Sequence, residues 1–460
     1  MKKEIFIDVN EDEVRGALVE DGNLAELFIE RNNDQNIAGN VYLAKVVNVV
    51  EGIQAAFLSI GNKEVFLPLE EERIRKGDKV LIQITKEAIG NKSAKATTKI
   101  SLPGRYLVYT PTSNKHGISK NIVDVKERFR LKEIVSSIRK VEGSFIVRTE
   151  AEGHKDHDLI RDAKYLMRLW KITERNRNAE PPKLLHRAFG IVFYIVRELF
   201  TDDFDMLVIN SKKEFRDVFA YVRMVAPQLR RKIRFHKKET PLFNTYNLEQ
   251  QISRIKDQKV PLQCGGSIVI QQTEALTSID VNTGKYVSGR DREESAFIAN
   301  CQAAREIPRQ LMLRNIGGII IVDFIDMESR KHNHKIHEIL QEEIKHDKAK
   351  IDILPITRMG LLEMTRERKR DNVVNVMCQP CPYCKGSGLV FDEITMYIKI
   401  KKEILRMAPE TKNRQLDIFM HPKVAALFDD KKVNELSRAA GKQLKIRPDY
   451  KLHQEEFEIK

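Results

Sequence analysis

The sequence predicts a multidomain protein of the α+β class, and three observations support this. A chain of 460 residues is long enough for roughly three domains of about 150 residues each. Hydrophobic residues make up 42% and charged residues 32%, which is typical of globular proteins with well-formed cores. Short β-rich runs come early in the chain, and mixed helical and strand patterns follow.

The first part of the chain is rich in β-strand patterns. Residues 4–9 (EIFIDV) and 14–29 (VRGALVEDGNLAELFI) predict short strands that open the fold. From 41 to 88, further β-rich runs are separated by single glycines, a spacing typical of a small all-β barrel. We therefore expect five short strands in an OB-type module.

A second small unit follows the linker-like stretch 110–119. It contains a strand at 144–149 and then a helix with a clear apolar stripe. The stripe consists of Leu159, Ala163, Leu166, Met167 and Trp170. This spacing places one side of the helix in a core, so we expect Trp170 to pack internally. Beyond it, residues 189–260 and 266–370 predict α/β layers, and a Cys/Pro/Gly-rich connector leads to a final α/β segment.

The charge of the chain points to a polyanionic partner. The formal net charge is +14 and the isoelectric point is near 9.3, so the protein attracts polyanions, of which nucleic acid is the commonest. The alternative is a basic enzyme with no such partner, and charge does not separate RNA from DNA. The N-terminus lacks the apolar core of a signal peptide, and no run approaches the ~18 apolar residues of a spanning helix, which predicts a cytoplasmic protein.

Two aspartates follow strand patterns in the second half of the chain. Asp280 ends the run 266–280, and Asp323 follows the nearly all-apolar run GGIIIVD. The isoleucines and valines before Asp323 predict a central strand buried on both faces, and ligands of open α/β sheets bind beyond the carboxyl ends of such strands. Two adjacent strands would bring the carboxylates within reach of one ion. The alternative is that each aspartate only caps a turn.

The chemistry of the pair favours magnesium. Carboxylates and water are the ligands that Mg²⁺ prefers, and an ion shared with phosphate can activate a water for phosphodiester hydrolysis. Asn282 lies two residues past Asp280 and points the same way along an extended chain, where it can orient the water or the phosphate.

The five cysteines favour metal ligation over a disulfide framework. Cys381 and Cys384 form a C-x-x-C knuckle flanked by proline and glycine, which is half of a structural zinc site. Either Cys378 and a histidine such as His332 or His346 complete the site in cis, or a second copy of the chain donates its own knuckle. The second option makes zinc the clasp of a symmetric dimer.

Several residues are candidates for contact with nucleic acid. Phe57 and Phe66 lie on adjacent predicted strands and Lys92 follows in a basic loop, so stacking faces lie beside a cation, as in single-strand binding sites; the alternative is that both rings are core. Arg148 and Thr149 end a strand and together can grip a phosphate. The run RERKR at 366–370 predicts a solvated helix face, with contact to backbone phosphates as the alternative.

Seven motifs taken together resemble the RNase E/G family of bacterial endoribonucleases, in the family's order and over essentially the whole chain. They are GNVYLAKVVNVVEGIQAAFLSIG, TKISLPGRYLVYTP, IVRTEAEG, EALTSIDVNTG, IVDFIDM, GLLEMTR and CPYCKGSG. The resemblance implies an RNase H-like subdomain split around an inserted OB-type, S1-like barrel and a 5′-sensor, then a DNase I-like α/β catalytic subdomain, a zinc link and a small α/β domain. The implied boundaries are 1–38 and 191–257 for the split subdomain, 39–100 for the barrel, 101–190 for the sensor, 258–375 for the catalytic subdomain, 376–390 for the link and 391–460 for the small domain.

The resemblance also implies roles for individual residues. Asp280 and Asp323 match the family's Mg²⁺-binding aspartates, Asn282 matches the asparagine beside them, and Lys350 occupies a position near the scissile phosphate that is often arginine. The sensor residues for a 5′-monophosphate are matched by Val108, Arg148 and Thr149, the RNA-contacting barrel residues by Phe57, Phe66 and Lys92, and the zinc knuckle shared between subunits by Cys381 and Cys384. The chain departs from well-known relatives at Lys120 and Asn121, where they carry two arginines, and at Cys378, which some of them lack.

The implied function is hydrolysis of single-stranded RNA by a Mg²⁺-activated water in a zinc-joined homodimer. The resemblance implies a preference for substrates with a 5′-monophosphate, products with 5′-phosphate and 3′-hydroxyl ends, and roles in rRNA processing and mRNA decay. Because the chain ends soon after the small domain, we expect it to resemble the shorter members of the family. The rival hypotheses are a non-catalytic RNA-binding protein and a deoxyribonuclease.

Overall fold

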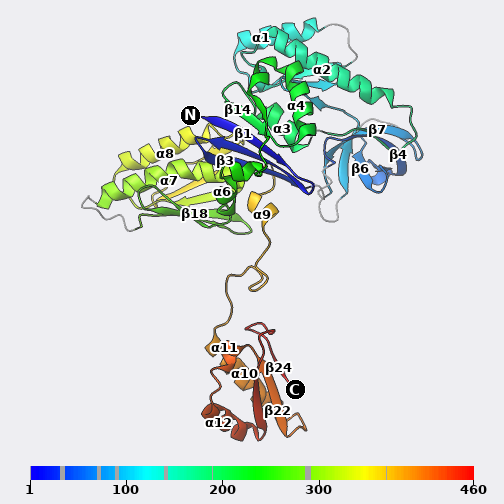
Figure 1. Ribbon diagram of the computed structural model, residues 1–460. Helices are drawn as coiled ribbons and strands as arrows, with labels where there is room; N and C mark the ends of the chain where they lie inside the picture. Colours follow the sequence, from blue (N-terminus) through cyan, green and yellow to red (C-terminus); the bar gives the residue numbers. More distant parts are fainter. Residues whose placement is uncertain are drawn as a thin grey trace. The chain divides into compact units, whose positions relative to one another are not determined.

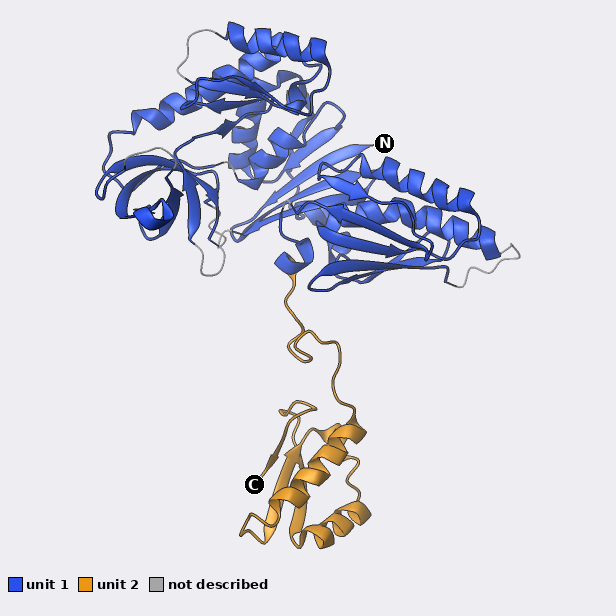
Figure 2. Cartoon of the chain, turned by 180° about the vertical axis from the view of Figure 1, so that it is seen from behind, with its two compact units in different colours: residues 1–376 blue, residues 377–460 orange. Residues whose placement is uncertain are grey.

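The computed structural model describes residues 2–31, 37–69, 74–88, 93–138, 143–188, 190–284, 292–368 and 370–460. The chain forms two compact units, residues 1–376 and residues 377–460 (Figure 2). None of the helices that the structure describes has both the length and the apolar character needed to cross a membrane.

The first sheet of unit 1, the N-terminal sheet, has the strand order β15-β14-β1-β2-β3 (Figure 1). Its strands are β1 (Lys3–Val9), β2 (Glu13–Glu20), β3 (Asn23–Arg31), β14 (Met206–Ile209) and β15 (Ile233–Phe235). Helices α3 (Ile191–Glu198) and α4 (Lys212–Val225) pack their apolar sides against it. The chain leaves this sheet after β3 and returns to it much later, at β14, which pairs in parallel with the central strand β1.

The inserted segment begins with a closed barrel. Its strands are β4 (Val41–Val50), β5 (Ala55–Ser59), β6 (Glu64–Pro68), β7 (Lys79–Lys86) and β8 (Ala94–Thr97). They pair in the order β4-β5-β6-β8-β7, and β4 also pairs with β7, which closes the barrel. The predicted five-stranded OB-like barrel is therefore confirmed. Strand β13 (Lys183–His186) pairs with residues 41–43 of β4, ahead of the part of β4 that pairs with β5. A short 3-10 helix, η1 (Glu51–Ile53), connects β4 with β5.

A small four-stranded sheet follows the barrel, with the order β11-β12-β10-β9. Its strands are β9 (Leu102–Pro103), β10 (Leu107–Thr110), β11 (Gly117–Ile118) and β12 (Ser144–Val147), and its helices are α1 (Val125–Ser137), η2 (Thr149–Ala151) and α2 (Asp156–Arg175). The predicted apolar stripe of α2 packs in the core of the small unit that this sheet and its helices form, where Trp170 is only 7% exposed. The prediction that Trp170 packs internally is confirmed.

Asp162 of α2 lies on this apolar stripe and organises the turn before β10. Its fully buried carboxylate accepts hydrogen bonds from the backbone N–H groups of Arg105, Tyr106 and Leu107 at 3.2, 2.8 and 3.0 Å. A Cβ atom on Gly104 would lie 2.5 Å from a carboxylate oxygen of Asp162, so the close approach requires glycine there. The turn that bears Gly104 is thus held in place from within the core.

We expect Asp162→Ala to destabilise this unit by about 3 kcal/mol or more, because three buried N–H groups lose their acceptor. Trp170, the single tryptophan of the chain, lies in the same core and reports unfolding of this unit in a urea titration followed by fluorescence. The control is Asp156→Ala, which removes an exposed partner of Arg130 and should cost less than about 1 kcal/mol. Equal urea midpoints for the two variants would contradict the assignment.

The second large sheet, here the aspartate sheet, has the order β16-β17-β18-β19-β21-β20. Its strands are β16 (Lys259–Pro261), β17 (Ser267–Gln272), β18 (Leu276–Asn282), β19 (Gly318–Asp323), β20 (Ile351–Ile353) and β21 (Leu361–Arg366). Helices α7 (Arg292–Arg314) and α8 (Arg330–Ile344) cover one of its faces (Figure 1). The prediction that β19 is buried on both faces is wrong: Ile320 and Val322 are buried under the helices, whereas Ile319 is 52% exposed on the open face.

Residues 366–368 and 370 of the basic run are not helical, contrary to the prediction, and Lys369 lies outside the residues that the structure describes. Arg366 ends β21 and is buried, with an ion pair to Asp347 at 2.7 Å and a hydrogen bond to the carbonyl oxygen of Ile316 at 2.7 Å. Arg370 stacks its guanidinium over the ring of Phe28, 4.0 Å from the ring centre. These contacts join the aspartate sheet to its own connecting loops and to the N-terminal sheet.

The remaining elements complete both units. In unit 1 they are η3 (Pro227–Lys232), α5 (Leu242–Thr245) and α6 (Leu248–Ser253), and α9 (Val373–Met377) reaches the boundary between the units. Unit 2 contains α10 (Glu393–Met407), β22 (Gln415–Met420), α11 (Pro422–Ala425), α12 (Asp430–Ala440), β23 (Gln443–Pro448) and β24 (Phe457–Ile459). Its sheet has the order β23-β22-β24, and Met396, Ile400 and Ile404 of α10 pack in its core.

Candidate functional site

Asp280 and Asp323 lie side by side on the open face of the aspartate sheet. Strands β18 and β19 are parallel neighbours, and their register pairs Asp280 directly with Asp323. Both side chains are exposed, while the alternate residues Ile279 and Val322 point into the core beneath the helices. Alternation along the two strands therefore presents both carboxylates to solvent from one face.

Two asparagines hold the aspartates in position. The side-chain amide of Asn282 donates a hydrogen bond to a carboxylate oxygen of Asp280 at 2.7 Å. Asn300, fully buried in α7, donates to the carbonyl oxygen of Ile325 at 2.8 Å and accepts from its N–H at 3.0 Å. The backbone that follows Asp323 is thus anchored from the core.

The donor set of this pair fits a magnesium ion. In the described part of the chain, no three His, Cys, Asp or Glu side chains gather closely enough to hold an ion by themselves. Two carboxylates on adjacent strands leave most coordination positions to water and to substrate phosphate, which is the way Mg²⁺ is usually bound. Asp280 and Asp323 are the residues that would hold it.

Lys350, the fourth residue expected at this site, lies elsewhere on the same sheet. It comes just before β20, where its carbonyl oxygen accepts from Glu367, and its side chain forms a 3.5 Å ion pair with Asp352. The strand register places it level with Gly317, six residues before Asp323 and about 20 Å away along the strands. Within one chain the structure does not bring Lys350 to the aspartate pair, because β20 begins level with Gly318, at the opposite end of β19 from Asp323.

Two half-buried aromatic residues lie on the surface of the barrel. Phe57 on β5 and Phe66 on β6 are direct cross-strand partners, with ring centres 5.9 Å apart and an edge-to-face arrangement. Both are half-buried, and neither belongs to the buried core of the barrel. Their outer faces are therefore available for stacking. Lys92 lies outside the residues that the structure describes.

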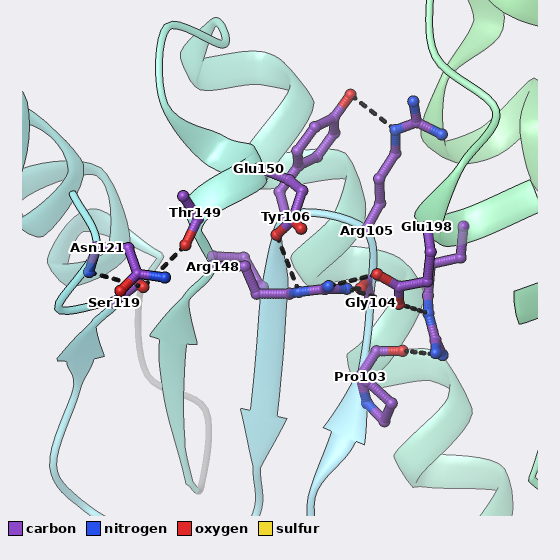
Figure 3. Close-up of polar contacts among 12 residues, drawn as sticks. Pro103, Gly104, Arg105, Tyr106, Ser119, Asn121, Arg148, Thr149, Glu150 and Glu198 are labelled. Atoms are coloured by element: carbon purple, nitrogen blue, oxygen red, sulfur yellow. Dashed lines mark hydrogen bonds and ion pairs between the residues drawn. The ribbon is translucent and has the colours of Figure 1, made fainter. Parts of the chain in front are cut away.

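The three predicted sensor residues come together on the small sheet. Val108 on β10 pairs with Ile146 of β12, and Arg148 and Thr149 follow directly after β12. Figure 3 shows that the side chains of Arg148 and Thr149 turn apart. The hydroxyl of Thr149 lies 2.9 Å from that of Ser119, while Arg148 reaches toward the turn at Gly104.

Arg148 is engaged by a carboxylate that the motifs do not contain. Its guanidinium donates to both carboxylate oxygens of Glu198, at 3.0 and 2.5 Å, and to the carbonyl oxygen of Gly104 at 2.7 Å (Figure 3). Arg197 also donates to Glu198, at 2.7 Å. Burial by itself would raise the pKa of Glu198, but the hydrogen bonds and charges of the two arginines lower it below its ordinary value. Glu198 is therefore held ionised between them.

The two thiols of the predicted cysteine knuckle, Cys381 and Cys384, lie in unit 2. The N–H of Gly388 donates to the sulfur of Cys384 at 3.3 Å, and the hydrogen bonds of Gly388 and Gly386 lower the pKa of this thiol. Among the described residues Cys378 does not join Cys381 and Cys384 in a group of three metal ligands. The donor set in one chain is thus two thiols, which fits half of a tetrahedral zinc site.

Sequence reasoning missed three residues that position these sites. Asp162 and Asn300 each lie on the apolar stripe of a helix, and a polar side chain on such a stripe is a signal for a buried, hydrogen-bonded role. Glu198 ends α3, where a carboxylate opposes the helix dipole, and this also signals a specific partner. The partner itself comes from a strand distant in sequence, so the pattern alone does not identify it.

Known proteins match this chain over its whole length. The model of the "Ribonuclease E/G family" matches residues 101–369. Ribonuclease G of Salmonella typhimurium is 33% identical over 100% of this chain and 99% of that protein, and ribonuclease G of Haemophilus influenzae is 34% identical over 99% of each. Ribonuclease E of Escherichia coli is 32% identical over 97% of this chain but only 44% of its own length. The predicted likeness to the shorter members is confirmed, and the chain belongs to the ribonuclease E/G family.

Proposed function

We propose that this member of the family is an endoribonuclease that hydrolyses single-stranded RNA at Asp280 and Asp323. The observation that carries the proposal is the direct pairing of the two aspartates on the open face of the sheet, with Asn282 bound to Asp280. The 33% identity to a ribonuclease G supports a catalytic role for the aspartates over one in which each only caps a turn. The net charge of +14 suits a polyanionic substrate.

Asp280 and Asp323 would hold the Mg²⁺, which, when bound, offsets charge on the phosphate and favours the hydroxide form of a water. The amide of Asn282 fixes the rotamer of Asp280, and Asn300 fixes the backbone beyond Asp323. In the reaction a water oxygen bonds to phosphorus as the bond to the 3′-oxygen breaks, and the leaving oxygen takes up a proton. The products would carry 5′-phosphate and 3′-hydroxyl ends.

The other parts of the chain would bind the RNA. The half-buried rings of Phe57 and Phe66 would stack against bases, beside Lys92, and Val108, Arg148 and Thr149 would receive a 5′-monophosphate. We assign the N-terminal sheet, which is split by the insertion, to the RNase H-like subdomain and the aspartate sheet to the DNase I-like subdomain, within the boundaries expected from the sequence. Physiological substrates would be rRNA precursors and mRNA in the cytoplasm.

Two subunits would share one zinc ion through Cys381 and Cys384 of each. The support is the chemistry of the knuckle: a tetrahedral structural site takes four ligands, and one chain offers a pair of thiols there. A two-fold axis through the ion would then make the chain a homodimer.

The test of the function is a cleavage assay with a fluorescent single-stranded oligonucleotide in Mg²⁺. We expect internal cleavage of RNA, no cleavage of the DNA of the same sequence, and products whose masses carry a 5′-phosphate and a 3′-hydroxyl. RNA that is bound but remains uncut would support a non-catalytic RNA-binding protein instead, and equal cleavage of DNA would support a deoxyribonuclease.

The 5′ end of the substrate should affect the rate. We expect a 5′-monophosphorylated oligonucleotide to be cut about tenfold faster than its 5′-hydroxyl counterpart, because charge-assisted hydrogen bonds to one phosphate are worth a few kcal/mol at most. We expect a 5′-triphosphate to gain little, since Arg148 and Thr149 offer donors for a single phosphate group. Competition between the three substrates in one tube measures the ratios directly, and equal rates would refute the sensor.

A further inference from the structure

Glu198 connects the predicted sensor to the rest of unit 1. Its carboxylate forms a two-pronged ion pair with Arg148, and both side chains are largely buried, at 17% and 14% exposure. Arg148 makes two further contacts, with the carbonyl oxygen of Gly104 at 2.7 Å and with Glu150 at 3.4 Å. In this arrangement the guanidinium points away from Thr149 (Figure 3). A phosphate that binds both Arg148 and Thr149 must therefore compete with Glu198 for the guanidinium.

The backbone of Glu198 is held by the aspartate sheet. Glu198 is the last residue of α3, and its carbonyl oxygen is one of the groups that a helix leaves without an intrahelical partner. The ammonium of Lys348 donates to this oxygen at 2.6 Å. Lys348 lies between α8 and β20, so the contact spans from the last turn of α3 to the aspartate sheet. A cation at the C-terminus of a helix is also favoured by the helix dipole.

The segment that bears Lys348 is connected to the start of β19 through the contacts of Arg366. Its neighbour Asp347 forms a buried ion pair with Arg366 at 2.7 Å, with both side chains 6% exposed. Arg366 in turn donates to the carbonyl oxygen of Ile316, two residues before β19, the strand that ends at Asp323. A series of polar contacts, joined in places by the backbone, thus runs from Arg148 to the start of β19, the strand that ends at Asp323.

We propose that Glu198 and Lys348 couple the binding of a 5′-phosphate at Arg148 to the position of the aspartate sheet. The proposal rests on the proposed sensor and nuclease functions. The phosphate exchanges with the carboxylate of Glu198 on Arg148, and Glu198 keeps its bond to Arg197. The last turn of α3 then moves against Lys348, which passes the change to β19. Glu198 and Lys348 are positioning residues in this scheme, because neither contacts the reacting atoms.

The test is Lys348→Met in the full chain, assayed with the 5′-monophosphorylated and 5′-hydroxyl oligonucleotides. We expect the rate advantage of the monophosphate to fall about tenfold, within the range usual for coupling between two sites, while the 5′-hydroxyl rate stays within about twofold. Lys348→Arg, which keeps the cation, should restore the advantage. The matched control is Lys345→Met, which removes an exposed lysine whose ion pair among the described residues is with Glu342 on the helix surface and should change neither rate.

Glu198→Gln gives a second, independent readout. The amide weakens the pair with Arg148, so we expect tighter binding of a 5′-monophosphorylated, 2′-O-methyl oligonucleotide that cannot be cut, together with a smaller rate advantage for the cleavable one. If Lys348→Met fails to fold, the result for Glu198→Gln alone tests the coupling. An unchanged monophosphate advantage in both folded variants would overturn the coupling. If the unaltered protein cuts the monophosphorylated substrate no faster than the 5′-hydroxyl one, the proposed sensor and the coupling that depends on it are both wrong. Cleavage of the 5′-hydroxyl substrate tests the nuclease function separately.

Discussion

Asp280→Asn and Asp323→Asn are each expected to lower the cleavage rate by about a thousandfold or more. Each variant removes one of the two negative charges that would hold the ion, and several kcal/mol of transition-state stabilisation depend on that ion. A loss of about 4 kcal/mol corresponds to a factor of about a thousand. Single-turnover cleavage of the 5′-monophosphorylated oligonucleotide measures the effect. The pairing of the two residues in one register predicts that the double variant is no worse than either single one.

RNA binding should survive in these variants, because the positive charge of the chain and the proposed RNA contacts of the barrel are unchanged. Fluorescence anisotropy with uncut oligonucleotide measures the affinity. Asp352→Asn is the matched control: it removes an exposed carboxylate from β20 of the same sheet, away from the pair, and should leave the rate within about twofold. Full activity of both Asp280→Asn and Asp323→Asn would refute the metal site.

Cys381→Ser is expected to convert the proposed zinc-joined dimer into monomers that hold no zinc. Two of the four thiolates of a shared site would be lost at once, and a structural zinc contributes about 10 kcal/mol or more to the assembly that it holds. Light scattering with size-exclusion chromatography gives the mass, to be compared with multiples of 53.3 kDa, and elemental analysis gives the zinc content per chain. Chelation of the unaltered protein should have the same effect.

Cys378→Ser is the control for this experiment. Cys378 is exposed and stands apart from the pair of ligands, so we expect this variant to keep both its zinc and its dimer. Loss of zinc from Cys378→Ser would show instead that Cys378 is a ligand. A dimer that persists in Cys381→Ser without zinc would refute the clasp.

The sequence by itself determined the parts of the protein that depend on local patterns. Glycine-spaced β-rich runs predicted the barrel, and the stripe of α2 predicted the buried position of Trp170. Strand patterns that end near Asp280 and Asp323 predicted a pair, and the family motifs identified the family. Periodicity and motif spacing carry this information because they reflect the geometry of single strands, helices and knuckles.

Only the tertiary structure decided what depends on pairing between distant segments. A run of isoleucines reads as a strand buried on both faces, but the placement of α7 and α8 leaves one face open. The register of β20 and β21 carries Lys350 away from the aspartates. Glu198 of α3 accepts hydrogen bonds from Arg148 with its carboxylate and from Lys348 with its carbonyl oxygen, and these partners come from different parts of the chain. Such contacts are set by the packing of whole layers, and no local pattern of residues encodes which side chains then meet.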